Sequence, residues 1–238
     1  MSFAQSRIDR DASWERLRIG REQHAFIAGA TGSGKSVLAR FLVLDPLKQY
    51  SVVWDPKHSR TVSQWPGQKF IYSFDELEGS EERRIVYRPP IEAGESAEEQ
   101  LRFFRWIFEQ GHVRCYVDEC VALLDNQRGN LWFRACLQMG RELGVSMVCA
   151  TQRPVSIPII TMSEASRVFV FRLNWPEDQE RIKKITGISE REQQALGKHE
   201  FFCWSSEHGR IGDKFKLSPE AVNRGFIPLN RSEKYGRS

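Results

Sequence analysis

Eight consecutive residues near the amino terminus restrict the possible folds of this chain more than any other stretch. They run Gly29-Ala30-Thr31-Gly32-Ser33-Gly34-Lys35-Ser36 and match G-x-x-x-x-G-K-[ST], a phosphate-binding loop. Glycines let the backbone turn so that its N–H groups face phosphate oxygens without an intervening Cβ. Lys35 would reach the β- and γ-phosphates, and the Ser36 hydroxyl would coordinate Mg²⁺. The motif therefore predicts a nucleoside triphosphate and Mg²⁺ as ligands.

The residues on either side of the loop support this match. His24-Ala25-Phe26-Ile27-Ala28 is apolar enough to form a short buried strand that leads into the loop. Residues 37–44 have the pattern of a helix that leaves it and stops before Pro46. A strand, a glycine-rich turn and a helix in this order are the context in which such a loop binds phosphate.

Composition is typical of an ordinary globular protein. The 238 residues are 40% hydrophobic and 28% charged, and this length suits one large α/β domain or two small ones. The net charge of +4 permits a nucleic-acid partner without requiring one. Five cysteines, an odd number without a C-x-x-C pair, indicate buried thiols in a reducing compartment. No apolar run approaches the roughly 20 residues of a membrane span, so we expect a soluble cytoplasmic protein.

Strands alternate with helices along the chain, and this alternation predicts a three-layer α/β fold with a mostly parallel central sheet. We expect an N-terminal arm over residues 1–20, a single nucleotide-binding domain over 21–217, and a C-terminal helix or tail over 218–238. Strands are predicted at 24–28, 51–54, 69–72, 84–87, 113–117, 145–150, 167–171, 201–204 and 214–216. Helices are predicted at 37–44, 131–143, 178–186 and 189–196, with a further helix that begins at the Ser96–Glu99 capping box and ends at Gly111.

Two carboxylates directly follow the predicted strand at 113–117. Asp118 would hold the Mg²⁺ shell, and the adjacent Glu119 would polarise an attacking water, which favours hydrolysis over transfer to a small acceptor. Gln152 follows the strand at 145–150 and would reach the same sheet edge, near the γ-phosphate. The alternative is that Thr151 and Gln152 only cap the next turn. A small-molecule kinase is the main rival, but it would need an acceptor pocket and a lid with paired arginines.

Four motifs in order resemble the FtsK/HerA superfamily of P-loop ATPases over roughly residues 22–216. They are the phosphate loop, Asp55-Pro56-Lys57, Asp118-Glu119, and the segment 140–154 that ends in Ala150-Thr151-Gln152-Arg153-Pro154. The resemblance implies an additional-strand, RecA/FtsK-like fold and an ATP-driven homo-oligomeric ring that pumps double-stranded DNA regardless of sequence. Since the chain is short, it looks most like a minimal viral genome-packaging ATPase.

A ring of this kind needs an arginine that reaches the neighbouring subunit's nucleotide. Arg141 and Arg167 each precede a predicted strand, about five residues or roughly 16 Å from their own nucleotide edge. Both are therefore poorly placed in cis and available in trans. The resemblance supports either placement, and we favour Arg141 while keeping both. The alternative is an ordinary surface ion pair.

The resemblance also suggests which loops face DNA. Lys57, His58 and Arg60 follow the second strand, and Arg128 lies in the polar turn at 125–130. These side chains could contact phosphates without reading bases. Without the resemblance they would be exposed loop residues.

The sequence therefore predicts an ATPase that translocates double-stranded DNA, packaging a viral genome into a preformed capsid through a portal or membrane vertex protein. It would act in the cytoplasm, that of the host if the protein is viral, and could associate with the virion during packaging. The alternatives are a cellular or plasmid DNA-transfer or segregation ATPase of the same superfamily, and a nucleotide-dependent assembly protein that does not move DNA.

Overall fold

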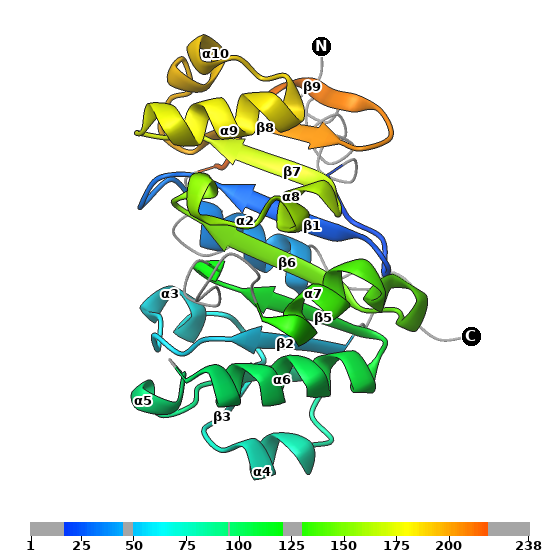
Figure 1. The fold of residues 1–238 in the computed structure, drawn as a ribbon. Coiled ribbons are helices and arrows are strands. Elements are labelled where there is room, and N and C mark those ends of the chain that lie inside the picture. Colours follow the sequence, from blue (N-terminus) through cyan, green and yellow to red (C-terminus); the bar gives the residue numbers. More distant parts are fainter. Residues whose placement is uncertain (1–16, 45–49, 95, 121–129, 219–238) are drawn as a thin grey trace, which may run out of the picture.

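A single sheet organises the molecule, in the strand order β3-β4-β2-β5-β6-β1-β7-β8-β9 (Figure 1). The computed structural model describes residues 17–44, 50–94, 96–120 and 130–218. The strands are β1 (His24–Ala28), β2 (Tyr50–Trp54), β3 (Lys69–Ile71), β4 (Arg84–Tyr87), β5 (Val113–Val117), β6 (Ser146–Thr151), β7 (Ala165–Phe171), β8 (Glu200–Ser205) and β9 (Gly209–Lys216).

The first seven strands in that spatial order, from β3 to β7, are mutually parallel, whereas β8 and β9 add an antiparallel hairpin. Strands β1, β5 and β6 are buried at every residue, as expected when both faces of a parallel sheet are covered. The fold class predicted from the alternating pattern is confirmed.

Helices cover both faces of the sheet (Figure 1). They are α2 (Lys35–Val43), α3 (Arg60–Ser63), α4 (Phe74–Glu78), α5 (Ile91–Gly94), α6 (Ala97–Gln110), α7 (Leu131–Gln138), α8 (Ile159–Ser163), α9 (Pro176–Thr186) and α10 (Glu190–Gln194), with 3₁₀ turns η2 (Gly140–Leu143) and η3 (Pro154–Ser156). Apolar side chains of α2 pack on one face, and those of α6, α7, α8 and α9 pack on the other. Leu17 and Ile19 join the core on the α2 face. The two cores hold the sheet in a rigid sandwich.

Several local predictions change in detail. The helix predicted over 131–143 ends at Gln138, and a separate 3₁₀ turn follows, closed by Gly144 in the left-handed conformation. The capping box at Ser96 is half formed, because the Glu99 carboxylate accepts a hydrogen bond from the Tyr87 hydroxyl instead. The short helices α3, α4, α5 and α8 were not predicted, since each is under two turns and carries little periodic signal.

The topology determines which loops can form a site. Strand β6 lies between β1 and β5, which confirms the expected additional strand. Parallel strands bring the carboxyl ends of β1, β5, β6 and β2 to one edge, and α2 begins at that same edge. None of the described helices combines the length and apolar character that a membrane span requires. The predicted arm falls almost wholly outside the described residues, and the predicted C-terminal tail does so beyond Ser218.

Candidate active site

The phosphate loop leaves β1 as a tight turn in which two positions require glycine. A Cβ at Gly29 would lie 2.6 Å from the Cβ of Phe171, so no larger residue fits. Gly34 has φ of +110°, a conformation that L side chains rarely adopt, and it caps the N-terminus of α2. The loop is tied to its neighbours, because the amides of Gly29 and Ala30 donate to the carbonyls of Thr151 and Arg172 at 3.2 and 3.0 Å. The predicted cradle is therefore present and braced by β6 and β7.

Lys35 lies folded inside this turn. Its Nζ donates to the carbonyl oxygens of Gly29 at 2.8 Å and Ala30 at 3.1 Å, and the residue is 8% exposed. Burial lowers the pKa of the Lys35 ammonium, against the opposing influence of the Asp118 and Glu119 carboxylates. A bound phosphate would replace these two neutral acceptors with anionic oxygens, so that both partners of the contact carry charge.

Asp118 follows β5 on the same sheet face as Tyr116 and near Ser36. Burial raises the pKa of Asp118 above its ordinary value, although the Tyr116 hydroxyl and Lys35 counteract this. The Tyr116 hydroxyl is buried and makes no hydrogen bond to a described residue. Ser36 and Asp118 nevertheless lie close enough to influence its pKa, which burial raises well above the ordinary value. The hydroxyl of Ser36 and the carboxylate of Asp118 are oxygen ligands that suit Mg²⁺.

Glu119 is held in a defined orientation. Its Oε1 accepts a 3.0 Å hydrogen bond from the Thr151 hydroxyl and a 3.4 Å bond from the Gln152 amide. Its backbone φ is 52°, a left-handed conformation that is uncommon outside glycine and concentrates at functional sites. The carboxylate is thus positioned at the carboxyl end of β6, beside the loop.

Gln152 connects the phosphate loop to Glu119, because it bonds both Thr31 and the Glu119 carboxylate. The Thr31 hydroxyl donates to the Gln152 side-chain oxygen at 2.5 Å. Thr151 also accepts a 3.0 Å hydrogen bond from the Arg153 amide. Thr151 therefore caps the next turn, as the second alternative from the sequence has it, and it also orients Glu119. The role of Gln152 near the γ-phosphate stays a prediction.

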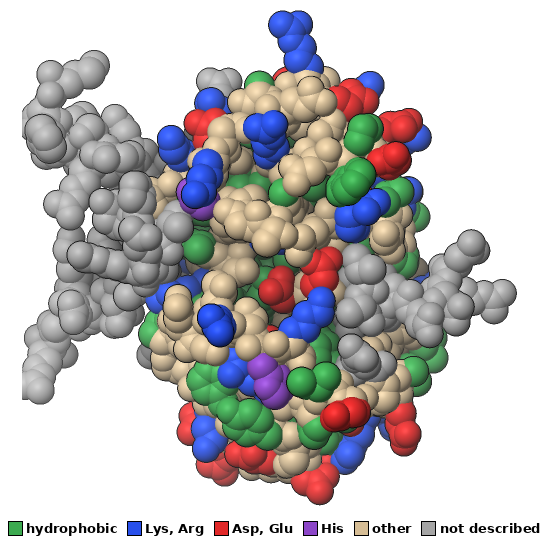
Figure 2. Space-filling view, turned by 90° about the vertical axis from the view of Figure 1, so that its left-hand side faces the viewer, with side chains coloured by type: hydrophobic (Ala, Val, Ile, Leu, Met, Phe, Trp, Pro, Cys, Tyr) green, Lys and Arg blue, Asp and Glu red, His purple; other side chains and the backbone are tan. Residues whose placement is uncertain are grey.

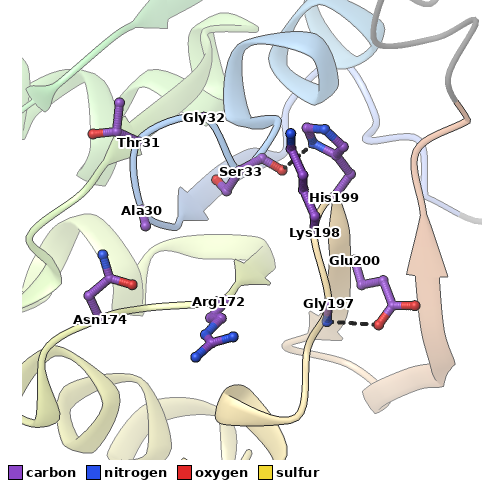
Figure 3. A pocket seen from close by; sticks show the side chains of 10 residues that line it. All are labelled: Ala30, Thr31, Gly32, Ser33, Arg172, Asn174, Gly197, Lys198, His199 and Glu200. Carbon is purple, nitrogen blue, oxygen red and sulfur yellow. Dashed lines mark hydrogen bonds between the residues drawn. The ribbon is translucent and has the colours of Figure 1, made fainter.

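Two pockets meet at the phosphate loop. The larger, of about 430 Å³, combines the loop with Asp118, Glu119, Gln152 and Lys57. Seen from this edge, acidic and basic side chains gather around the middle of the molecule (Figure 2). The smaller, of about 330 Å³, lies on the other side of the loop between the end of β7 and the start of β8 (Figure 3). A triphosphate across the loop would have room for its terminal phosphate in the first pocket and for its nucleoside in the second.

His199 borders both pockets and was missed by the sequence analysis. Its Nδ1 lies 3.1 Å from the carbonyl oxygen of Ser33, as Figure 3 shows, and its φ is 63°. Because a carbonyl only accepts, Nδ1 carries the proton. The hydrogen bond joins residues that are 166 positions apart, so no local pattern pointed to it. The sequence offered only the position of His199 just before the strand predicted at 201–204.

Of the two trans-arginine candidates, Arg141 precedes β6 as expected, whereas Arg167 lies within β7 and not before it, because that strand begins at Ala165. The trans role of either arginine stays a prediction. Arg141, in η2, donates to the carbonyl oxygen of Glu164 and has its Nη2 3.6 Å from that residue's carboxylate. Arg167, four residues before the end of β7, donates to the Ser205 hydroxyl at 2.5 Å. Neither is placed to reach the subunit's own phosphate loop.

The residues suggested for DNA contact are separated by the structure. Lys57 lines the larger pocket, whereas His58 bonds the Pro89 carbonyl at 3.1 Å and Arg60 is an exposed residue at the start of α3. Arg128 lies outside the described residues. These assignments remain predictions.

The fold and the braced loop define the class: the chain has the α/β fold of P-loop NTPases. No protein-family model matches the sequence, and no curated protein matches it. Among solved structures, the genome packaging NTPase B204 from Sulfolobus turreted icosahedral virus 2, in complex with ATP-gammaS, superimposes with a TM-score of 0.69. The identity is 16% over 84% of this chain and 100% of B204.

Two proteins of other systems share the fold over part of their length. The pCW3 conjugation coupling protein TcpA matches with a TM-score of 0.56 and 14% identity, over 84% of this chain and 62% of TcpA. The cytoplasmic domain of the type VII secretion ATPase EccC from Thermomonospora curvata gives 0.54 and 18%, over 85% of this chain and 27% of EccC. At these identities the similarity establishes the fold.

Proposed function

We propose that this protein is an ATPase that drives double-stranded DNA, and that it packages a viral genome into a preformed capsid. The observation that carries the proposal is the orientation of Glu119 by Thr151 and the Gln152 amide beside a braced phosphate loop. The similarity of the whole fold to a genome packaging NTPase, over that protein's full length, supports the biological setting.

The residues of one subunit divide the chemistry between them. The loop amides and Lys35 bind the phosphates, and Ser36 and Asp118 would hold Mg²⁺, which neutralises charge on the phosphate oxygens. Glu119 orients and polarises the attacking water, and Gln152, bonded to Thr31 across the loop, is placed to sense the terminal phosphate. General-base catalysis of this kind contributes about 10²–10⁴-fold to the rate.

Coupling to DNA requires an oligomer. In a homo-oligomeric ring, Arg141 or Arg167 would approach the neighbour's nucleotide, a contact worth about 10³–10⁵ in rate in related phosphoryl transfers. His58, Arg60 and Arg128 would face DNA phosphates in the ring opening, so binding would ignore sequence and fall steeply with salt. A portal or membrane vertex protein is the partner that such a motor needs in the cytoplasm of the infected cell.

ATP hydrolysis measured with and without duplex DNA, over a range of protein concentrations, tests the proposal. We expect stimulation by DNA and a concentration threshold, because complete sites form only between subunits. The Glu119→Gln variant should lose about 10²–10⁴ in turnover and accumulate as an ATP-bound oligomer on duplex DNA. The Glu207→Gln variant, an exposed change far from the loop, is the control. Hydrolysis that is indifferent to both DNA and concentration would refute the motor.

A further inference from the structure

We propose that Lys57 contacts the terminal phosphate of the nucleotide bound to its own subunit, rather than DNA. The inference rests on the proposed function only in requiring that a nucleoside triphosphate binds at the phosphate loop. It gives the site a second cation beside Lys35 and moves one residue from the DNA interface to the catalytic pocket.

Sheet register places Lys57 at the pocket. Strands β2 and β5 are parallel neighbours, and Trp54 pairs with Val117. Lys57 therefore follows the end of β2 by three residues, and Asp118 follows the end of β5 by one, on the same edge. Lys57 lines the 430 Å³ pocket together with Lys35, Asp118 and Glu119. It lies close enough to Asp118 to act electrostatically on that carboxylate.

A buried ion pair holds the turn that carries Lys57. Asp55 is 1% exposed, and its Oδ2 lies 2.8 Å from Nε of Arg88, which itself is 8% exposed. The Asp55 carboxylate also accepts from the Ser59 amide at 2.9 and 3.1 Å, and its carbonyl accepts from the His58 amide at 3.2 Å. The turn is therefore closed on both sides of Lys57.

Arg88 completes the support from the other side of the turn. Its Nη2 donates to the Ser59 carbonyl at 3.1 Å and to the Ser63 hydroxyl at 2.8 Å, and its guanidinium lies 4.6 Å from the Phe70 ring centroid. Removing one member of such a buried pair would leave the other charge buried without its partner, so the pair holds the turn in place. The backbone thus presents Lys57 at a constant position on the rim of the pocket.

Of the three basic residues at this turn, Lys57 is the one that lines the pocket. It makes no hydrogen bond or ion pair with any residue in the described ranges, and its side chain is exposed on the rim. His58 is already engaged by the Pro89 carbonyl, and Arg60 does not line the pocket. The turn therefore presents the Lys57 ammonium at the rim of a pocket that also contains Asp118 and Glu119. Since no described residue pairs with this ammonium, it is available to bind an anionic ligand.

The terminal phosphate is the ligand whose charge matches this arrangement. Negative charge is spread over the three γ-oxygens in the transition state of phosphoryl transfer, and a fixed cation at that point stabilises it. Lys35 approaches from within the loop, whereas Lys57 approaches from the side of β2. Since ADP lacks the γ-phosphate, a contact of this kind would favour ATP over ADP.

The Lys57→Met variant of the full chain, which keeps the aliphatic stem, tests the proposal with Arg60→Met as the matched control. Dissociation constants for ATP-gammaS and ADP are measured with Mg²⁺, and duplex DNA affinity is measured without nucleotide at several salt concentrations. We expect Lys57→Met to weaken ATP-gammaS binding about tenfold or more, as for one charge-assisted contact, and to change ADP binding by less than about twofold. DNA affinity and its salt slope should stay as in the wild type, and Lys57→Arg should recover most of the ATP-gammaS affinity.

A different pattern would overturn the assignment. If Lys57→Met binds ATP-gammaS as the wild type does, the contact is absent. If it also loses DNA affinity with a salt slope shallower by about one unit, Lys57 is a DNA phosphate contact. Failure of the wild-type protein to bind ATP-gammaS at all would instead refute the proposed function, so the two failures are distinguishable.

Discussion

The Thr151 hydroxyl donates a 3.0 Å hydrogen bond to the Glu119 carboxylate and accepts one of 3.0 Å from the Arg153 amide. Thr151 is the last residue of β6, and Glu119 lies in the loop after β5. The two residues meet because β5 and β6 are parallel neighbours that end at the same edge of the sheet. One hydroxyl therefore connects the carboxylate expected to activate water to the turn that follows the central strand.

Removing that hydroxyl should disorient Glu119 without emptying the site. We expect Thr151→Val to lower kcat by about tenfold to a hundredfold, since small displacements of a catalytic group cost this much. The affinity for ATP-gammaS should change by less than about twofold, because Thr151 contacts no phosphate-binding group except through the Gly29 amide, which bonds its carbonyl. Thr151→Ser keeps the hydroxyl and should retain activity. Equal kcat for the Val and Ser variants would show that the bond has no role in hydrolysis.

His199 should support the phosphate loop through its bond to the Ser33 carbonyl. Asn tolerates the left-handed backbone at this position, but its side chain is too short to reproduce the imidazole contact. We expect His199→Asn to weaken ATP-gammaS and ADP equally, by about threefold to tenfold, which is the net value of one hydrogen bond. His208→Asn, in the exposed turn before β9, is the control. A loss confined to ATP-gammaS would mean that His199 contacts the terminal phosphate instead.

The choice between Arg141 and Arg167 can be decided by mixing inactive subunits. A Lys35→Ala subunit cannot hydrolyse ATP in its own site but still supplies its arginines to a neighbour. An Arg141→Ala or Arg167→Ala subunit retains an intact phosphate loop. If an arginine acts in trans, its variant mixed with Lys35→Ala should regain DNA-stimulated hydrolysis, because some interfaces then contain both groups. The arginine variant alone should lose about 10³-fold or more. We expect recovery for one of the two, and a double variant with normal turnover would exclude both.

His24 should make the fold sensitive to acid. It is 1% exposed, its Nε2 bonds the Leu137 carbonyl at 3.0 Å, and its Nδ1 accepts from the Met147 amide at 3.0 Å. Burial, reinforced by the positive charge of Arg141, lowers the pKa of His24 from 6.5 to about 4. The unfolded chain therefore binds a proton that the native state does not between these values, so the free energy of unfolding falls as the pH drops through this window.

The expected loss between pH 6.5 and about 4 is roughly 3 kcal/mol at 1.36 kcal/mol per pKa unit. It can be measured by urea denaturation at a series of pH values. His24→Gln should be less stable at neutral pH but should lack this part of the pH dependence. His208→Gln should follow the wild-type curve. Parallel curves for His24→Gln and the wild type would show that His24 does not titrate between the two states.

Local sequence patterns were sufficient to predict those parts of the site that are made of consecutive residues. The phosphate loop, its flanking strand and helix, and Asp118-Glu119 after an apolar strand are contiguous, and the structure places them at one sheet edge as expected. The position of β6 between β1 and β5 was expected as well, whereas the order of the other strands was not predicted. Helix ends and short helices were less predictable, since one turn carries too little periodicity to be recognised.

By itself, the sequence determined that a phosphate-loop motif and a strand-end carboxylate lie at the carboxyl edge of a parallel sheet, because this arrangement needs only a glycine-rich turn, a lysine and a carboxylate at fixed spacing. That a triphosphate binds there is its prediction. Only the tertiary structure decided what surrounds the phosphates. Thr151 bonds Glu119, His199 bonds the Ser33 carbonyl, and Arg88 bonds Asp55 beneath the turn that carries Lys57. These contacts join residues 32, 166 and 33 positions apart. Such pairings depend on strand register and side-chain packing, which no local pattern in one sequence encodes.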